Sequence, residues 1–233
     1  MVCSDIIYNY DVQEIEEVIE DANFVKSLNL DSTSFYSLMI HEGSELSQKE
    51  IVESSLNRDY QFYKAFYNEF ISDSSWELME LTKFIKKGKD KYKYIYLRNH
   101  GHDTLAIGVG AGGNIGLYGS YNMNDKMSFF IKEAEIHQKY RLLGGLLQFP
   151  SYNFEEIKSI LTFDDYNYFI SLLTELEKNE MGTLHENYFS LNISGVFWGN
   201  NISKFICDKL IEKELKKWLK KFYFCFYVLQ HYL

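Results

Sequence analysis

The chain has 233 residues, a length that suits one large domain or two small ones. Its 33 acidic residues outnumber its 24 basic ones, and the formal net charge is −9. This negative charge argues against nonspecific electrostatic binding to the phosphate backbone of a nucleic acid, so we expect no nucleic-acid partner. Hydrophobic residues make up 46% of the chain, which is enough to bury a core and excludes wholesale disorder.

The cysteines and the chain ends indicate the cellular compartment that we expect for this protein. Cys3, Cys207 and Cys225 fit neither a disulfide framework nor a zinc motif, so we expect a reducing, cytoplasmic location. The N-terminus shows no secretory signal. No run reaches the ~18 apolar residues of a membrane helix, and the nearest, Phe222 to Leu233, is interrupted by Gln230. We therefore expect no membrane span.

The first forty residues predict a strand, a helix and a second strand. Val2 to Tyr8 is short and β-prone, and an amphipathic helix follows from about Gln13 to Leu28, with Asp11 as its N-cap. Ser32 to Ile40 is the second strand. Such a βαβ unit is normally parallel and right-handed, which indicates an α/β fold.

The middle of the chain is predicted to be mostly helical and then mostly extended. Residues 45–87 predict helices, with one apolar stripe at Tyr60, Tyr63, Phe66 and Phe70, and a later helix containing Trp76, Met79 and Phe84. Two strands are expected next, at Tyr92 to Leu97 and Thr104 to Val109. A helix capped by Asn124 or Asp125 then lasts to about Tyr140.

The composition changes near Pro150, where we place a domain boundary. Thr162-x-x-Asp165 predicts a capping box, Gly182 to Asn192 alternates like two short strands, and Ser194 is expected to cap a final helix. Helix, hairpin and helix resemble a winged-helix module. The predicted domains are therefore 1–145, a winged-helix-like domain at 146–212, and a basic-aromatic tail at 213–233.

Two short motifs have both a functional and an ordinary interpretation. Gly108-x-Gly110-x-x-Gly113 matches a dinucleotide fingerprint, but the expected helix starts too late to meet a pyrophosphate. A glycine-rich strand end that lines a pocket is favoured instead. His100, His102 and Asp103 could begin a metal site, although a solvated polar turn is favoured for a single cluster.

Charged side chains at the two ends leave alternatives open. Asp5 lies within a predicted core strand, where a carboxylate must be paired or face a ligand, and the residues alone do not decide between these. Lysines before Phe222 could anchor the tail to a membrane surface or nucleic acid. The end of an amphipathic helix is favoured for these lysines, which are Lys213, Lys216, Lys217, Lys220 and Lys221.

Several segments together resemble one enzyme family. They are Asp5-Ile-Ile-Tyr-Asn, Asp31-Ser-Thr-Ser-Phe-Tyr-Ser-Leu-Met-Ile with His41-Glu-Gly-Ser, the glycine-rich run within Asp103 to Gly113, and Leu191-Asn-Ile-Ser-Gly-Val-Phe-Trp-Gly-Asn-Asn. In order and spacing they resemble the radical SAM, oxygen-independent coproporphyrinogen III oxidases over residues 2–212. The amino acids of these motifs are most similar to those of the heme-utilisation subgroup, whose members methylate heme and open its ring anaerobically.

The resemblance implies a partial (β/α) barrel with a [4Fe-4S] cluster and S-adenosylmethionine, which is cleaved to a 5′-deoxyadenosyl radical, and a tetrapyrrole substrate. By this resemblance Asp5 and Met39 contact S-adenosylmethionine, Met39 through its main chain. The segment near a second cofactor or the substrate contains Gly110, Gly112, Gly113 and Asn114.

The chain also departs from that family. The C-x-x-x-C-x-x-C cluster motif is absent, and Cys3, Cys207 and Cys225 do not share one loop as three cluster ligands would. The family's first barrel strands would lie before Met1, and a core strand at a chain start is unusual. We therefore expect the carboxyl-terminal half of such an enzyme, inactive without a cluster-binding half.

The motifs and the resemblance leave two candidate functions. One is a fragment of a radical SAM enzyme that acts on coproporphyrinogen or heme. The other is a non-catalytic module that binds heme or another tetrapyrrole with the same fold.

Overall fold

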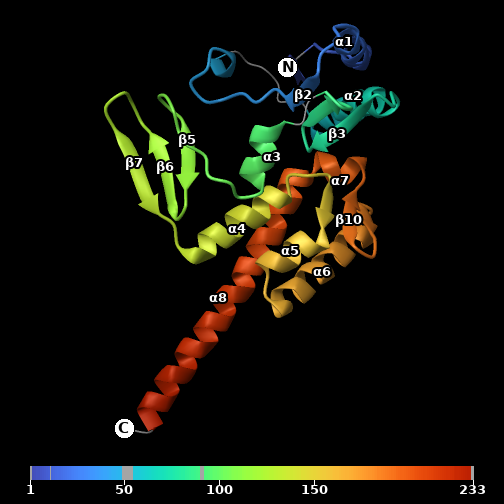
Figure 1. The fold of residues 1–233 in the computed structure, drawn as a ribbon. Coiled ribbons are helices and arrows are strands. Elements are labelled where there is room, and N and C mark those ends of the chain that lie inside the picture. The colour runs from blue at the N-terminus through green and yellow to red at the C-terminus, as the bar shows by residue number, and fades with distance from the viewer. Residues whose placement is uncertain (1, 11, 49–54, 90–91, 232–233) are drawn as a thin grey trace. The chain divides into compact units, whose positions relative to one another are not determined.

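The computed structural model describes residues 2–10, 12–48, 55–89 and 92–231, with side chains described as far as residue 217. The chain forms two compact units, Met1–Tyr96 and Leu97–Leu233 (Figure 1). The predicted boundaries at 145/146 and 212/213 stay predictions. Within the described residues, no helix combines the length and the apolar character that crossing a membrane requires.

The first unit contains a four-stranded sheet with the strand order β1-β2-β4-β3. β1 (Cys3–Tyr8) and β2 (Ser32–Ser37) are parallel, as predicted, and α1 (Ile15–Ser27) connects them. The N-cap of α1 is Glu14, whose side chain forms a capping box with Glu17. The expected cap, Asp11, lies outside the described residues.

The sequence wrongly predicted a helix where the structure has a hairpin. β3 (Trp76–Glu80) and β4 (Lys83–Lys86) pair antiparallel, and β4 also pairs with β2. The register shifts between Leu78 and Glu80, and such a bulge breaks the two-residue alternation that identifies a strand in a sequence. A short 3-10 helix, η1 (Leu46–Gln48), also precedes the helix α2 (Leu56–Ile71).

The core of the first unit is aromatic. α2 buries Phe62, Tyr63, Phe66 and Phe70, which confirms most of the predicted apolar stripe, while Tyr60 is only partly buried. The ring of Phe35 on β2 stacks between Tyr8, with centroids 3.9 Å apart, and Phe66, at 3.6 Å. Helices therefore cover one face of the sheet, and by strand alternation Asp5, Ser32 and Ser34 are directed to the other.

The second unit begins within α3 (Lys93–Asn99), so the strand predicted at Tyr92 to Leu97 is wrong. An antiparallel sheet follows, made of β5 (Gly112–Ile115), β6 (Tyr118–Asn122) and β7 (Ser128–Lys132). The strand predicted at Thr104 to Val109 is reduced to one bridge between Thr104 and Asn114.

The helix predicted from residue 124 or 125 to Tyr140 is wrong in its first half. β7 occupies that half, and α4 (Glu135–Leu146) starts only after it. The run Phe129-Phe-Ile is long enough for either element, and pairing with β6 decides in favour of a strand. β7 is exposed along its whole length.

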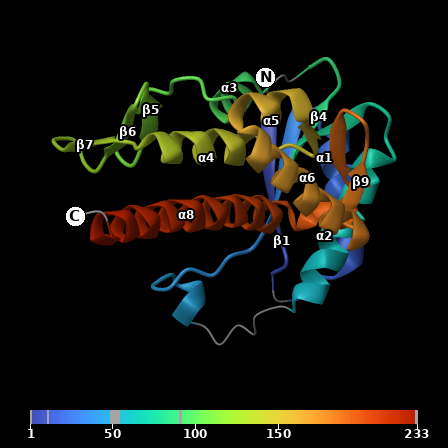
Figure 2. The same cartoon turned by 90° about the horizontal axis from the view of Figure 1, so that it is seen from below.

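The remaining residues form a three-stranded antiparallel sheet packed with helices. The strands are β8 (Ser151–Asn153), β9 (Gly182–Leu184) and β10 (Tyr188–Leu191), and the helices are α5 (Phe154–Ile160), α6 (Phe163–Lys178), α7 (Ile193–Phe197) and α8 (Gly199–His231). α4 and α6 pack against α8 (Figure 2).

The predicted helix, hairpin and helix are present here, and Thr162 caps α6 as expected. The cap of α7 is Asn192 and not Ser194, because the Asn192 side chain accepts a hydrogen bond from Gly195 N. The winged-helix-like assignment itself stays a prediction.

Candidate functional site

A row of polar side chains crosses the face of the first sheet that lies opposite the aromatic core. Asp5 on β1 pairs in register with Ser34 on β2, and Ser34 pairs with Lys83 on β4. Partners in register project to the same side of a sheet, so these three side chains form a row, the polar face. Strand alternation directs their neighbours, including Phe35 and Phe84, to the core side.

Lys83 is the central charge of the polar face. It is only 2% exposed. Its Nζ lies 3.5 Å from Ser34 Oγ and 4.2 Å from the centroid of the Tyr92 ring. In the described part of the chain no carboxylate forms an ion pair with it. A buried ammonium is costly unless it is paired, so this arrangement is unusual for a purely structural lysine.

Tyr92 holds its ring over Lys83 from a strained backbone. Its φ is +38°, in the left-handed region that residues other than glycine rarely adopt. Burial raises the pKa of the Tyr92 hydroxyl to about 12, with further contributions from the charges of Glu80, Tyr36, Cys3 and Asp5. These groups therefore surround the same part of the polar face.

A second buried polar group lies on this face. Ser32 pairs in register with Cys3 and is fully buried. Its Oγ has no hydrogen-bond partner within the described structure. Buried hydroxyls are normally paired, so Ser32 adds a hydrogen-bonding group that the chain itself leaves unused. The signal in the sequence was only the serine alternation in Ser-Thr-Ser.

Asp5 is the sequence-predicted residue that the structure places on the polar face. It lies in the middle of β1 and is exposed, so the cost of burying an unpaired carboxylate does not arise. Its register with Ser34 brings it into the same row as Lys83. No pattern in the sequence singled out the other members of this face, which are Lys83, Ser32, Ser34 and Tyr92.

Met39 lies past the carboxyl end of the parallel pair. The ladder extends to Leu38, whose N donates to Tyr8 O at 2.8 Å, and Met39 follows with its side chain 72% exposed. At the same edge, Asn9 donates to Ser37 Oγ, and Gln13 is buried with its Nε2 unpaired among the described residues. Ligands of parallel sheets typically bind beyond such carboxyl ends.

The predicted glycine-rich segment belongs to the second unit and begins the β5–β7 sheet. Gly110 has a φ of +77°, and a Cβ on Gly113 would lie 2.3 Å from Thr104 O. Asn114 is buried and exchanges two backbone hydrogen bonds with Thr104. Gly112 and Gly113 lie within β5, so Gly108-x-Gly110-x-x-Gly113 leads into a strand and not into a phosphate-binding helix.

The structure describes the side chains of two of the three cysteines. Cys3 is exposed in the first unit and Cys207 lies in the second, where burial raises its pKa to about 11. The side chain of Cys225 lies outside the described residues. Within the described residues, no group of three His, Cys, Asp or Glu side chains is arranged to hold a metal ion.

The histidine turn makes local contacts. His100 Nε2 lies 3.8 Å from Glu156 Oε2, and its ring lies 5.3 Å from that of Phe149. Asp103 Oδ1 accepts a hydrogen bond from Gly116 N at 2.9 Å. These contacts account for His100 and Asp103 as structural residues of the second unit.

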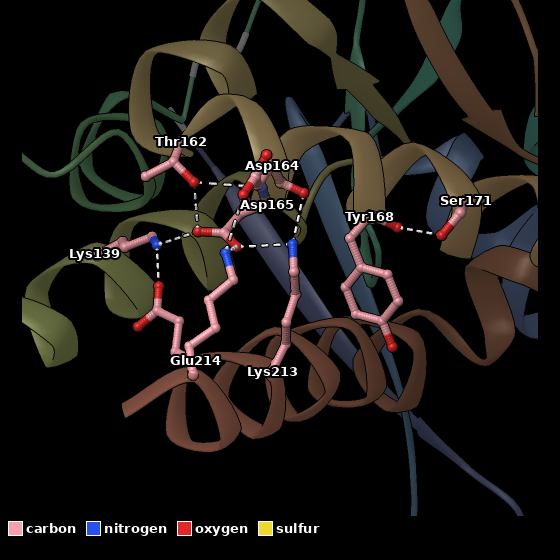
Figure 3. A network of polar contacts seen from close by, with 9 residues as sticks. Lys139, Thr162, Asp164, Asp165, Tyr168, Ser171, Lys213 and Glu214 are labelled. Atoms are coloured by element: carbon pink, nitrogen blue, oxygen red, sulfur yellow. Dashed lines mark hydrogen bonds and ion pairs between the residues drawn. The ribbon is translucent and has the colours of Figure 1, made fainter. Parts of the chain in front are cut away.

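A network of ions in the second unit joins α4, α6 and α8 (Figure 3). Asp165 Oδ1 lies 3.0 Å from Lys213 Nζ, and Asp165 Oδ2 lies 3.3 Å from Lys139 Nζ. Lys139 also contacts Glu214, and Lys217 contacts Asp164. Part of the predicted basic tail is thus used for internal packing, and each of these charges has an opposite partner.

The fold is similar to that of a solved enzyme. Coproporphyrinogen III oxidase from Escherichia coli, described as a radical SAM enzyme, superimposes with a TM-score of 0.66 and 18% identity. The match covers 88% of this chain and 54% of that one, so this chain spans about half the length of the enzyme. No protein-family model matches the chain, and no curated protein matches it. The comparison therefore shows a shared fold.

Proposed function

We propose that this chain supplies the part of a radical SAM enzyme that recognises S-adenosylmethionine and a tetrapyrrole. The observation that carries the proposal is the fold shared with coproporphyrinogen III oxidase over 88% of the chain. The quoted motifs support it because they lie in the order that the family has. Asp5 adds an exposed carboxylate at the polar face.

In this proposal Asp5 contacts S-adenosylmethionine from the sheet, and the main chain at Met39 contacts it at the carboxyl edge of β2. Gly110 to Asn114 lie near the substrate or a second cofactor. The substrate is coproporphyrinogen or heme, and the reaction is decarboxylation or methyl transfer with ring opening. The amino acids of the quoted motifs favour the heme-utilisation subgroup.

The cysteines present cannot form the [4Fe-4S] site, so the chemistry that the cluster supplies must come from elsewhere. We propose a separate cluster-binding segment as the partner and no turnover by residues 1–233 alone. The same observation supports the alternative function, a non-catalytic heme or tetrapyrrole module.

Binding of S-adenosylhomocysteine separates the two functions. We expect calorimetric titration to show saturable binding by the chain and at least tenfold weaker binding by Asp5→Asn, because a charged hydrogen bond is lost (about 1.5–3 kcal/mol). Glu20→Gln is the matched control, since Glu20 is an exposed carboxylate on α1. Heme binding without any S-adenosylhomocysteine binding would favour the non-catalytic module.

A further inference from the structure

Lys83 differs from three partly buried lysines of this chain. Lys26, Lys139 and Lys213 have side chains that are 18%, 19% and 24% exposed, and each lies within 4 Å of a carboxylate. Lys83 is far more deeply buried, and its contacts are the Ser34 hydroxyl and the Tyr92 ring. Among these four lysines, the most deeply buried one is the one without a carboxylate partner in the described structure.

Glu80 on β3 is the register partner of Lys83, but in the described structure no ion pair joins a carboxylate to the Lys83 ammonium. The contact with Ser34 Oγ is long, at 3.5 Å, and leaves two of the three N–H donors of Lys83 without a hydrogen bond in the described structure. On the same face Ser32 Oγ is fully buried and has no partner among the described residues. Ser32 and Ser34 are two residues apart on β2, so their hydroxyls lie on the same side of the sheet as Lys83.

The backbone at Tyr92 is consistent with a built site. A left-handed φ is a strained conformation for a tyrosine, and such strain is common at ligand sites. The strained residue places an aromatic ring against the ammonium, in a cation–π contact. An aromatic ring carries no formal charge, so this contact does not replace an anionic partner.

We propose that Lys83, with Ser34 and Ser32, binds a carboxylate group of the ligand on the polar face. The inference rests on the proposed function, which offers two sources of a carboxylate. One is a propionate of the tetrapyrrole, and the other is the amino-acid carboxylate of S-adenosylmethionine. The planar, two-oxygen carboxylate suits one ammonium and neighbouring hydroxyls.

The test compares ligands with and without the carboxylate. The full chain is titrated with hemin and with hemin dimethyl ester, and separately with S-adenosylhomocysteine and with 5′-methylthioadenosine. We expect the wild-type chain to prefer the carboxylate form of one pair by about 10- to 100-fold, the strength of a charge-assisted hydrogen bond. The pair that shows the preference identifies the source of the carboxylate.

The variant Lys83→Met should lose that preference and bind both members of the pair equally. Lys86→Met is the matched control, since Lys86 is on the same strand but on the opposite face, 3.4 Å from Asn29 Oδ1. Lys86→Met should keep the preference. Without ligand, Lys83→Met should melt at the wild-type temperature or above it, because the variant removes a buried charge that has no ion pair within the described structure.

Each other result has a definite meaning. A wild-type chain that binds both members of each pair equally overturns the inference and leaves the proposed function standing, and this measurement needs no variant. A lower melting temperature of Lys83→Met without ligand, with the carboxylate preference unchanged, assigns Lys83 to the fold and also overturns the inference. A wild-type chain that binds none of the four ligands contradicts both proposals.

Discussion

Adjacent glycines on α4 meet very different surroundings. A Cβ on Gly145 would lie 2.4 Å from Asn99 O, whereas a Cβ on Gly144 would meet nothing within 4 Å. We expect Gly145→Ala to destabilise the second unit by about 1–3 kcal/mol through overpacking. Gly144→Ala should stabilise it by roughly 0.5–1 kcal/mol, because alanine favours the helix. Urea unfolding of both variants checks the pair, and equal effects would contradict the packing of Asn99 against α4.

Asp165 makes stability depend on acid pH. Burial alone would raise its pKa, but hydrogen bonds from Thr162 and Lys213 and the charge of Lys139 lower it to about 2. A folded-state pKa below the unfolded value of about 3.9 gives stability that is complete above that pH and is lost as the pH falls towards 2. The contribution is about 2 kcal/mol.

Asp165→Asn should therefore lower the free energy of unfolding at pH 7 and flatten its pH dependence between about 4 and 2. Asp208→Asn, in an exposed pair with Lys204, should change little. Denaturant titrations across this pH range make the comparison. An unchanged pH dependence in Asp165→Asn would show that the network of Figure 3 does not set the acid stability.

Among the elements, the contact between α2 and the first sheet depends on stacked rings. Phe66 is fully buried and stacks on both Phe35 and Phe70. Phe66→Ala should cost about 3–5 kcal/mol by leaving a cavity. Phe24→Ala, which removes an exposed ring from α1, should cost far less. Thermal unfolding followed by circular dichroism compares them, and a small effect of Phe66→Ala would contradict the assignment of the core.

Elements with clear periodicity could be predicted from the sequence. This is true of the β1-α1-β2 unit, α2 and α6. Each has regularly spaced apolar residues, and packing against one neighbouring element is enough to bury these residues. The β3–β4 hairpin, α3 and β7 were missed because a bulge or a short length hides their period, and pairing with distant residues decides their structure. In these segments the tertiary contacts, and not the local sequence pattern, determine the secondary structure.

The site was predictable only in part, for the same reason. Asp5 could be selected because its motif and its strand were both visible in the sequence. Lys83 could not, since it lies in the strand that was mistaken for a helix, and its burial depends on β2 and Tyr92. The need for glycine at Gly113 also became clear only when Thr104 was placed beside it.

At the scale of the whole molecule, β1 is an edge strand of the first sheet. Within the described residues β1 pairs only with β2, and the apolar side chains of Ile7 on β1 and of Val2 just before it are exposed. An unpaired edge with apolar side chains promotes association, so we expect the isolated chain to be poorly soluble or to require a partner. Size-exclusion chromatography with light scattering measures this. A soluble monomer that melts cooperatively would contradict the expectation.

The proposal that this chain binds a tetrapyrrole is tested most directly by anaerobic titration of the purified full chain with heme, followed by Soret absorbance. The proposed function predicts saturable binding in the micromolar range. A folded, soluble chain that shows no saturable change in the Soret band would contradict the claim.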